Sequence, residues 1–298
     1  MDTVGIEKTV LVGSSWFTIT LDPKVGFSRY DQNNAEILSI SANFPGRFEA
    51  WPTLNPQDPL KLDKLKRLHD RGATGLKLYI GHGYVSPLTG DYFFHTVAMD
   101  DPQLAPIYEY CTENFLPICF HVNPGPKTPG FAQEFVKVLQ SFPDLLIIAP
   151  HWALSSIRLS RLRELLCKFP NLMTDISFGH DTYLMAGLRR ISRDPEKYRE
   201  LIAEFPGRAM FGTDLVITAA RHKTDGWIRA RMKAYLDMLT LDQYESEILS
   251  GQTLRGLGLD QILLDNILSE NYRAFRRRRP KGTLVSSHID WLAFGVTP

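Results

Sequence analysis

The stretch LLIIAPH at residues 145–151 combines a short apolar run with a polar residue at its end, and an amphipathic pattern follows it at 155–169. This order of an apolar, β-branched run and then an amphipathic stretch recurs along most of the chain. The runs that predict strands are 8–13, 47–53, 75–80, 117–122, 145–151, 172–178 and 209–214. Strands that alternate with helices form parallel β/α units. Seven such units predict an α/β fold of the (β/α)8 TIM-barrel type rather than a doubly wound sheet.

The predicted helices lie between these strands and after the last one. Their ranges are 33–42, 60–71, 102–115, 130–142, 155–169, 183–205, 225–239, 241–250 and 261–277. Phe-Pro pairs at 142–143, 169–170 and 205–206 separate a helix from the next strand, because proline ends a helix. No glycine-rich dinucleotide fingerprint follows a predicted strand, and no Pro/Ser/Gly linker divides the chain. We therefore expect one barrel domain over residues 1–298, with 278–298 as a C-terminal extension.

Composition argues against several other classes of protein. Of the 298 residues, 44% are hydrophobic and 22% are charged, which is the balance of a soluble globular domain. The formal net charge of +1 provides no basic field for nucleic acid or an anionic membrane. The apolar runs are shorter than the ~20 residues of a membrane span, and the N-terminus lacks a signal-peptide pattern. Three cysteines without a CxxC pair fit reduced thiols, so we expect a cytoplasmic protein.

Three polar residues stand at the ends of predicted strands, namely His121, His151 and Asp214. In a parallel barrel, the loops at the carboxyl ends of the strands build the active site. Two imidazoles and a carboxylate are ligands that zinc accepts, and bound zinc lowers the pKa of its water to about 7. Strand alternation predicts which residues share their inward face: Cys119 with His121, Ile147 and Ala149 with His151, and Met210 and Gly212 with Asp214.

Each of the three residues has an ordinary alternative. A histidine at a strand end is more often a hydrogen-bonded structural residue than a ligand, and an aspartate after Gly-Thr can cap a turn. Their occurrence at corresponding ends of separate strands favours a functional site over three unrelated structural roles.

Six stretches also carry a family resemblance. In chain order they are GATGLKLYIG, LPICFHVNPG, LLIIAPHWA, NLMTDISFG, RAMFGTDL and ILSENYRAFRR. They resemble the successive motifs of the amidohydrolase-related TIM-barrel family, and they are most similar to its amidohydrolase-2 branch of hydrolases, lactonases and aromatic-acid decarboxylases. The resemblance covers nearly the whole chain, from Gly5 to Arg277.

The resemblance implies roles for four residues. His121 would be a metal ligand from strand five, and His151 would be the strand-six histidine, either a ligand or a proton carrier. Asp214 would be the strand-eight aspartate, which binds metal or acts as general base toward water. Lys77 takes the position of the strand-four lysine, which is carboxylated and bridges two metals in some relatives but is usually a plain barrel residue in this branch.

The chain departs from the family at its start. The family begins with a first strand that carries an HxH pair, whereas this chain starts at MDTVGIEKTVLVG, after that strand. Three explanations are open. The chain is a trimmed or mis-started version of a longer protein, which we favour, or it is a relative that dispenses with the first metal pair. In the third, the C-terminal tail takes the place of the missing first strand. In the tail, the predicted strand Leu284–Trp291 carries His288 and Asp290 on one face. HxD is a weak pattern, however, and both residues also fit an ordinary extension.

Several further residues near the predicted strand ends are candidates for the site. His82, His180 and Arg221 are candidates to bind substrate, and each equally fits a solvated loop. Asp175 is a candidate hydrogen-bond partner behind the site. Trp152 and Tyr79 could line an aromatic pocket, or they could simply pack. Cys119 is expected to pack inside the barrel. The four arginines at 276–279 are expected to end a helix, where their charges favour its dipole.

Together these observations predict a metal-dependent hydrolase of a small ester, lactone or amide, in which Asp214 takes a proton from the attacking water. One alternative is a non-oxidative decarboxylase of an aromatic or unsaturated carboxylic acid that uses the same His121, His151 and Asp214. The other is a catalytically inactive barrel that serves protein contacts. We expect a small-molecule substrate, no nucleic-acid or membrane partner, and a monomer or homo-oligomer.

Overall fold

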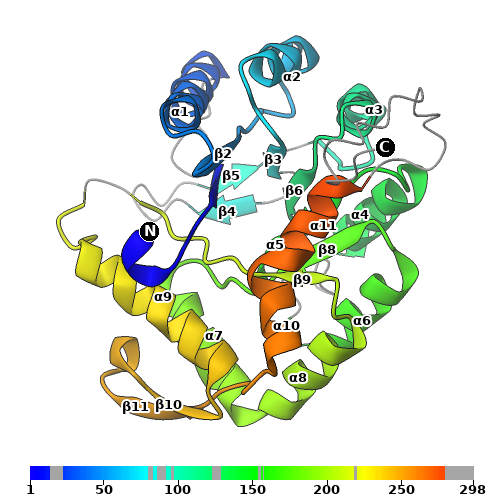
Figure 1. Cartoon of the computed structure of the whole chain (residues 1–298). Coiled ribbons are helices and arrows are strands. Elements are labelled where there is room, and N and C mark those ends of the chain that lie inside the picture. Colours follow the sequence, from blue (N-terminus) through cyan, green and yellow to red (C-terminus); the bar gives the residue numbers. More distant parts are fainter. Residues whose placement is uncertain are drawn as a thin grey trace, which may run out of the picture.

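The computed structural model describes residues 1–13, 23–79, 83–85, 92–94, 97–122, 129–153, 156, 158–217 and 220–278. Within these residues, parallel strands occupy the centre of the molecule and helices surround them (Figure 1). The central strands are β1 Thr9–Val12, β2 Phe48–Trp51, β3 Leu76–Tyr79, β6 Ile118–His121, β7 Ile147–Ala149, β8 Leu172–Asp175 and β9 Ala209–Met210. Each of them lies inside one of the seven predicted runs, which confirms the strand predictions.

The central strands follow one another in chain order. β3, β6, β7, β8 and β9 form one parallel sheet, and β1 pairs in parallel with β2. Two parallel bridges, Ala50–Ala73 and Thr53–Lys77, join β2 to the segment that contains β3. Parallel strands in chain order with helices outside them form the TIM-barrel type of α/β fold that the sequence predicted.

Helices connect the strands and complete the outer layer. They are α1 Pro23–Asn43, α2 Lys61–Asp70, α3 Ala105–Glu113, α4 Pro129–Ser141, α5 Pro150–Ala153, α6 Leu159–Lys168, α7 Asp181–Arg193, α8 Pro195–Glu204, α9 Asp225–Thr240, α10 Gln261–Asp265 and α11 Asn271–Arg277. The predicted helix at 183–205 is two helices, because Pro195 begins α8 where α7 has ended. In the described part of the chain, no helix is long and apolar enough to cross a membrane.

The predicted helix at 241–250 is wrong. This segment forms β10 Gln243–Ser246, which pairs with β11 Gln252–Arg255 as an antiparallel hairpin. Exposed and buried residues alternate along β10, and this period of two suits a strand rather than a helix. Ser250 and Gly251 reverse the chain with φ values of 55° and 77°. A second antiparallel hairpin, β4 Gly83–Val85 with β5 Tyr92–Phe94, was not predicted.

Alternate strand residues enter two separate cores. The outer core, between strands and helices, includes Ile118, Ile147 and Ala149. The inner core consists of Trp51, Cys119, Leu146, Ile148, Met173, Met210 and Phe275. The prediction that Cys119 packs inside the barrel is therefore confirmed. The prediction that Ile147 and Ala149 face inward is wrong, because Leu146 and Ile148 hold the inward positions of β7.

The last described helix, α11, lies between β9 and the β1–β2 pair, where the described residues contain no strand (Figure 1). Asn271 on α11 donates hydrogen bonds to the carbonyls of Pro206 and Ala209, both at 2.7 Å. Phe275, one turn further along, is fully buried in the inner core. Tyr272 reaches across to Glu49 on β2. One helix thus covers the side of the barrel between its first and last described strands.

Candidate active site

The backbone directly after β7 forms a left-handed turn. His151, Trp152 and Ala153 have φ values of 61°, 57° and 49°. This region costs a residue with a side chain about 1–2 kcal/mol. Two hydrogen bonds hold the turn, one from His151 N to Asp175 Oδ1 at 2.8 Å and one from Ala153 N to Thr174 Oγ1 at 3.0 Å. The turn therefore sets the direction of the His151 side chain, in place of the strand alternation that the sequence suggested.

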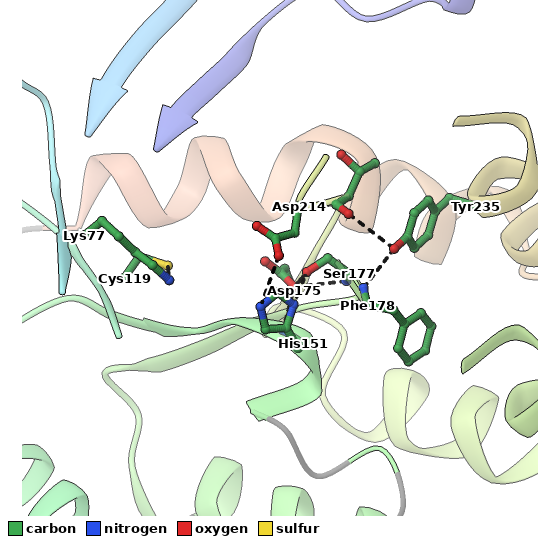
Figure 2. A network of polar contacts seen from close by, with 9 residues as sticks. Lys77, Cys119, His151, Asp175, Ser177, Phe178, Asp214 and Tyr235 are labelled. Atoms are coloured by element: carbon green, nitrogen blue, oxygen red, sulfur yellow. Dashed lines mark hydrogen bonds and ion pairs between the residues drawn. The ribbon is translucent and has the colours of Figure 1, made fainter. Parts of the chain in front are cut away.

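The buried His151 ring lies between Ser177 and Asp214 (Figure 2). Its Nδ1 is 2.7 Å from Ser177 Oγ, and Ser177 Oγ donates to Asp175 Oδ1 at 2.5 Å. On the other side of the ring, Nε2 is 3.6 Å from Asp214 Oδ2. Four polar side chains from the carboxyl ends of β7, β8 and β9 thus stand in series, in the order Asp175, Ser177, His151 and Asp214.

Two glycines make room for the carboxylates of this series. A Cβ atom on Gly179, whose φ is 74°, would lie 2.6 Å from Asp214 Oδ2. A Cβ atom on Gly212 would lie 2.9 Å from Asp175 Oδ2. The site therefore needs glycine at positions 179 and 212, because a larger side chain at either position would displace a carboxylate.

Asp214 lies among the strand ends but still meets solvent. Its φ is 51°, and 45% of its side-chain surface is exposed. Burial among the surrounding protein atoms raises the pKa of Asp214, and the neighbouring His151 and Lys77 side chains lower it in part. Asp214 therefore holds a proton more readily than an ordinary aspartate, while water can still reach its carboxylate.

His121 ends β6 beside the series, with its ring centroid 5.3 Å from that of His151. His151 Nε2 and Asp214 Oδ2, at 3.6 Å, are spaced to share one zinc ion, because Zn–N and Zn–O bonds of about 2.0–2.2 Å allow that separation. Within the described residues, however, no three His, Cys, Asp or Glu side chains are grouped as a metal site. The donors present thus fit a shared ion at the His151–Asp214 pair, and the role of His121 as a third ligand stays a prediction.

A second polar pair lies inside the barrel, on neighbouring strands. Lys77 on β3 and Cys119 on β6 are paired in register, and Lys77 Nζ donates to Cys119 Sγ at 3.5 Å. Both side chains are buried. Burial raises the pKa of the Cys119 thiol, and the Lys77 ammonium opposes this effect. The pair places a cation inside the barrel, where it acts electrostatically on Asp214.

Tyr235 on α9 is a functional candidate that the sequence did not reveal. Its buried hydroxyl accepts a hydrogen bond from Phe178 N at 2.8 Å and donates to Thr213 O at 3.4 Å (Figure 2). These two backbone groups belong to the loops that carry Ser177 and Asp214. Tyr235 therefore ties together the segments after β8 and β9, and only its helical spacing among buried residues could have indicated it.

The remaining predicted residues are not all at this centre. His180 is exposed, and its Nδ1 accepts from Thr182 N at 3.3 Å as the N-cap of α7. Arg221 is exposed in a turn before α9. Trp152 is fully buried and packs edge to face on Tyr198, at 5.3 Å between ring centroids. The predictions for His82, the Tyr79 side chain, His288 and Asp290 lie outside the described residues, as does nearly all of the predicted extension 278–298.

The sequence model of the amidohydrolase family known as Amidohydro_2 matches residues 20–274, most of the chain. The chain belongs to this family. The resemblance to the amidohydrolase-2 branch is thereby confirmed, and the family is divalent-metal dependent. Among functionally curated proteins, no sequence matches this chain.

Several solved structures share the fold of this chain at low sequence identity. An uncharacterised TIM-barrel protein, Bb4693 from Bordetella bronchiseptica, is 17% identical over 93% of this chain and 81% of that one, with a TM-score of 0.59. A 2,6-dihydroxybenzoate decarboxylase from Rhizobium is 17% identical over 93% and 85%, with a TM-score of 0.58. A Pseudomonas putida protein assigned as a 2-pyrone-4,6-dicarboxylic acid hydrolase is 16% identical over 92% and 84%, with a TM-score of 0.59. These similarities confirm the TIM-barrel fold.

Proposed function

We propose that this amidohydrolase hydrolyses a small ester, lactone or amide with a water molecule activated at the His151–Asp214 pair. The observation that carries the proposal is the 3.6 Å separation of His151 Nε2 and Asp214 Oδ2 at the carboxyl ends of β7 and β9. A TIM barrel builds its active site at this end of its strands. The two groups stand close enough to pass a proton between them through one intervening water or a reacting group.

A divalent metal, which we propose to be zinc, fits the same pair. His151 and Asp214 would hold it, and His121 is the proposed third ligand. When bound, such an ion polarises the substrate carbonyl and makes its water more acidic. The ligand set is testable by metal analysis, since a His121→Ala variant should lose the ion if that residue binds it.

The chain's own residues account for the movement of the proton. Water reaches the half-exposed Asp214 carboxylate, which accepts a proton as the water oxygen attacks the carbonyl carbon. The raised pKa of Asp214 favours this transfer. His151 Nε2 can then relay the proton to the leaving oxygen or nitrogen, so that the acyl–leaving group bond breaks with no net charge left on the protein.

The second candidate is the non-oxidative decarboxylase. The raised pKa of Asp214 favours its protonated form, and a protonated carboxyl group is the donor that decarboxylation requires. In that reaction the substrate loses carbon dioxide, and the carbon that carried it accepts a proton. The same pair would serve, with Asp214 acting first as an acid instead of as a base.

One assay separates the two reactions. The purified protein, with and without added zinc, is incubated with a panel of esters, lactones, amides and aromatic carboxylic acids. Acid release without carbon dioxide supports the hydrolase, and carbon dioxide release supports the decarboxylase. Asp214→Asn should abolish either activity, whereas Asp242→Asn, at a side chain that is 90% exposed, should not. No turnover on any class, with or without metal, would favour the inactive scaffold.

The proposal also covers the kind of substrate and the cellular compartment of the enzyme. We propose a small-molecule substrate rather than a macromolecular one, since the proposed reacting groups lie among the strand ends. Cys111, Cys119 and Cys167 form no disulfide. Reduced thiols accord with the cytosol, where disulfides are rare.

A further inference from the structure

We infer that Ser177 and Asp175 are positioning residues that hold His151 in one tautomer, with the proton on Nδ1 and the lone pair of Nε2 facing Asp214. The sequence indicated Asp175 only as a general partner behind the site and gave Ser177 no role. The inference deepens the proposed function, on which its catalytic consequence rests. The tautomer itself is a property of the protein without metal or substrate.

Asp175 is fixed by three donors on a single oxygen. Its Oδ1 accepts from His151 N at 2.8 Å, from Ser177 N at 2.9 Å and from Ser177 Oγ at 2.5 Å. A carboxyl oxygen that accepts three hydrogen bonds carries no proton of its own on that atom, so Oδ1 has none to give to Ser177. Asp175 is therefore an acceptor in this cluster, and the Ser177 hydroxyl must supply the hydrogen between them.

The short distance to Asp175 settles where the Ser177 hydrogen lies. Two oxygen atoms at 2.5 Å repel each other unless a proton stands between them, and this length is typical of a hydroxyl donating to a carboxylate. Serine has one hydroxyl hydrogen, so it is not available to His151. Ser177 Oγ therefore accepts at its 2.7 Å contact with His151 Nδ1, and Nδ1 carries the proton.

The protonation state of the opposite ring nitrogen, His151 Nε2, follows from this assignment. In a neutral imidazole only one nitrogen is protonated, so His151 Nε2 keeps its lone pair. That lone pair lies 3.6 Å from Asp214 Oδ2, in the place where the proposed function needs a proton acceptor or a ligand. The reverse tautomer would point an N–H at Asp214 and leave Nδ1 without its donor role toward Ser177.

Asp175 and Ser177 act on different parts of His151. Asp175 touches the His151 backbone and so also supports the left-handed turn. Ser177 touches only the ring. Ser177→Ala therefore removes the control of the ring while keeping the bond from His151 N to Asp175, which makes it the more specific variant.

The test is nitrogen NMR of the metal-free, full-length protein with ¹⁵N-labelled histidine, at about pH 8.5, where imidazole is mostly neutral. A His151→Asn variant assigns the His151 signals. We expect Nε2 of His151 to show the shift of an unprotonated nitrogen and Nδ1 that of a protonated one. In Ser177→Ala the two signals should move toward tautomer averaging, and Ser177→Thr, which keeps a hydroxyl, should restore them. Ser246→Ala, at another buried serine, should change neither.

Kinetics supply the second readout. With an active substrate, Ser177→Ala should lower kcat with little change in KM, by about the 10–100-fold typical when a metal-ligating histidine loses its hydrogen-bond partner. A protonated Nε2 in the wild-type protein, or an unchanged His151 signal in Ser177→Ala, would overturn the inference. The expected NMR result without turnover on any substrate would instead leave the tautomer established and overturn the proposed function alone.

Discussion

Tyr272 on α11 donates a hydrogen bond to Glu49 on β2 at 2.7 Å, across a sequence separation of 223 residues. Glu49 also accepts from Thr74 Oγ1 at 3.0 Å and is ion-paired with Lys8 and Arg276. α11 thus contacts a polar cluster around Glu49 on β2, two residues before Trp51 of the inner core. α11 is therefore packed against the barrel as one of its structural elements.

Phe275→Ala should destabilise the protein strongly. The Phe275 ring is fully buried in the inner core with Trp51, Met173 and Met210, and its removal leaves a cavity among strands that cannot close on it. Truncation of a buried phenylalanine costs about 3–5 kcal/mol. Urea unfolding followed by circular dichroism measures this loss. Leu268→Ala, at a position with 39% exposure, should change the free energy of unfolding far less. Similar stability of the two variants would mean that α11 does not seal the inner core.

Glu49 should make stability depend on pH in the acid range. Burial raises the pKa of Glu49, but the hydrogen bond from Tyr272 and the charges of Arg276 and Lys8 outweigh it, so the pKa lies below its usual value. A lowered pKa means that the folded state favours the ionised form. The contribution is therefore complete above the unfolded pKa of about 4.3 and is lost as pH falls through the lower folded value.

The free energies of unfolding of wild type and Glu49→Gln measure this effect between about pH 3 and 7. Their difference should be constant near neutrality and should shrink in the acid range. Glu245→Gln, on the exposed face of β10, should show no such trend. A difference that grows as the pH falls would contradict the lowered pKa.

The strands were predictable because each is a short apolar run closed by a turn or a polar residue. The hairpin of β10 and β11 was not, since LDQYESEILS also reads as an amphipathic helix and only the reversal at Ser250 and Gly251 decides between the two. The inward face of β7 was misjudged because the count began at His151. That residue belongs to the left-handed turn after β7, so its direction does not follow the alternation of the strand.

The sequence predicted the central residues of the candidate site, but not the hydrogen bonds that connect them. His151 and Asp214 were indicated by their places at strand ends, and the structure puts them 3.6 Å apart. Ser177 and Tyr235 act through contacts across 26 and 57 residues, which no local pattern encodes. Such contacts depend on how the strands and helices pack against one another, and this packing cannot be read from local sequence patterns.

Tyr235→Phe should weaken the connection between the loops after β8 and β9. The change keeps the ring but removes the acceptor of Phe178 N, and a buried N–H that loses its partner costs about 1–3 kcal/mol. We expect a lower melting temperature and, with an active substrate, a reduced kcat. Tyr183→Phe, at a residue that is 69% exposed, is the matched control and should behave as wild type. Equal melting temperatures of Tyr235→Phe and wild type would show that this hydroxyl does not hold the two loops.

Gly179→Ala should impair the site directly, for two separate reasons. Gly179 has a φ of 74°, which costs alanine about 1–2 kcal/mol. The new methyl group would also lie 2.6 Å from Asp214 Oδ2, so the carboxylate must move away from His151 Nε2. Because a misplacement of about 1 Å at a reacting group can cost ~100-fold in rate, we expect activity to fall by about 10–100-fold. Gly207→Ala is the control, since its added methyl group would meet nothing within 4 Å. Full activity in a folded Gly179→Ala protein would show that the position of Asp214 relative to His151 does not limit the reaction, and would count against the pair as the catalytic centre.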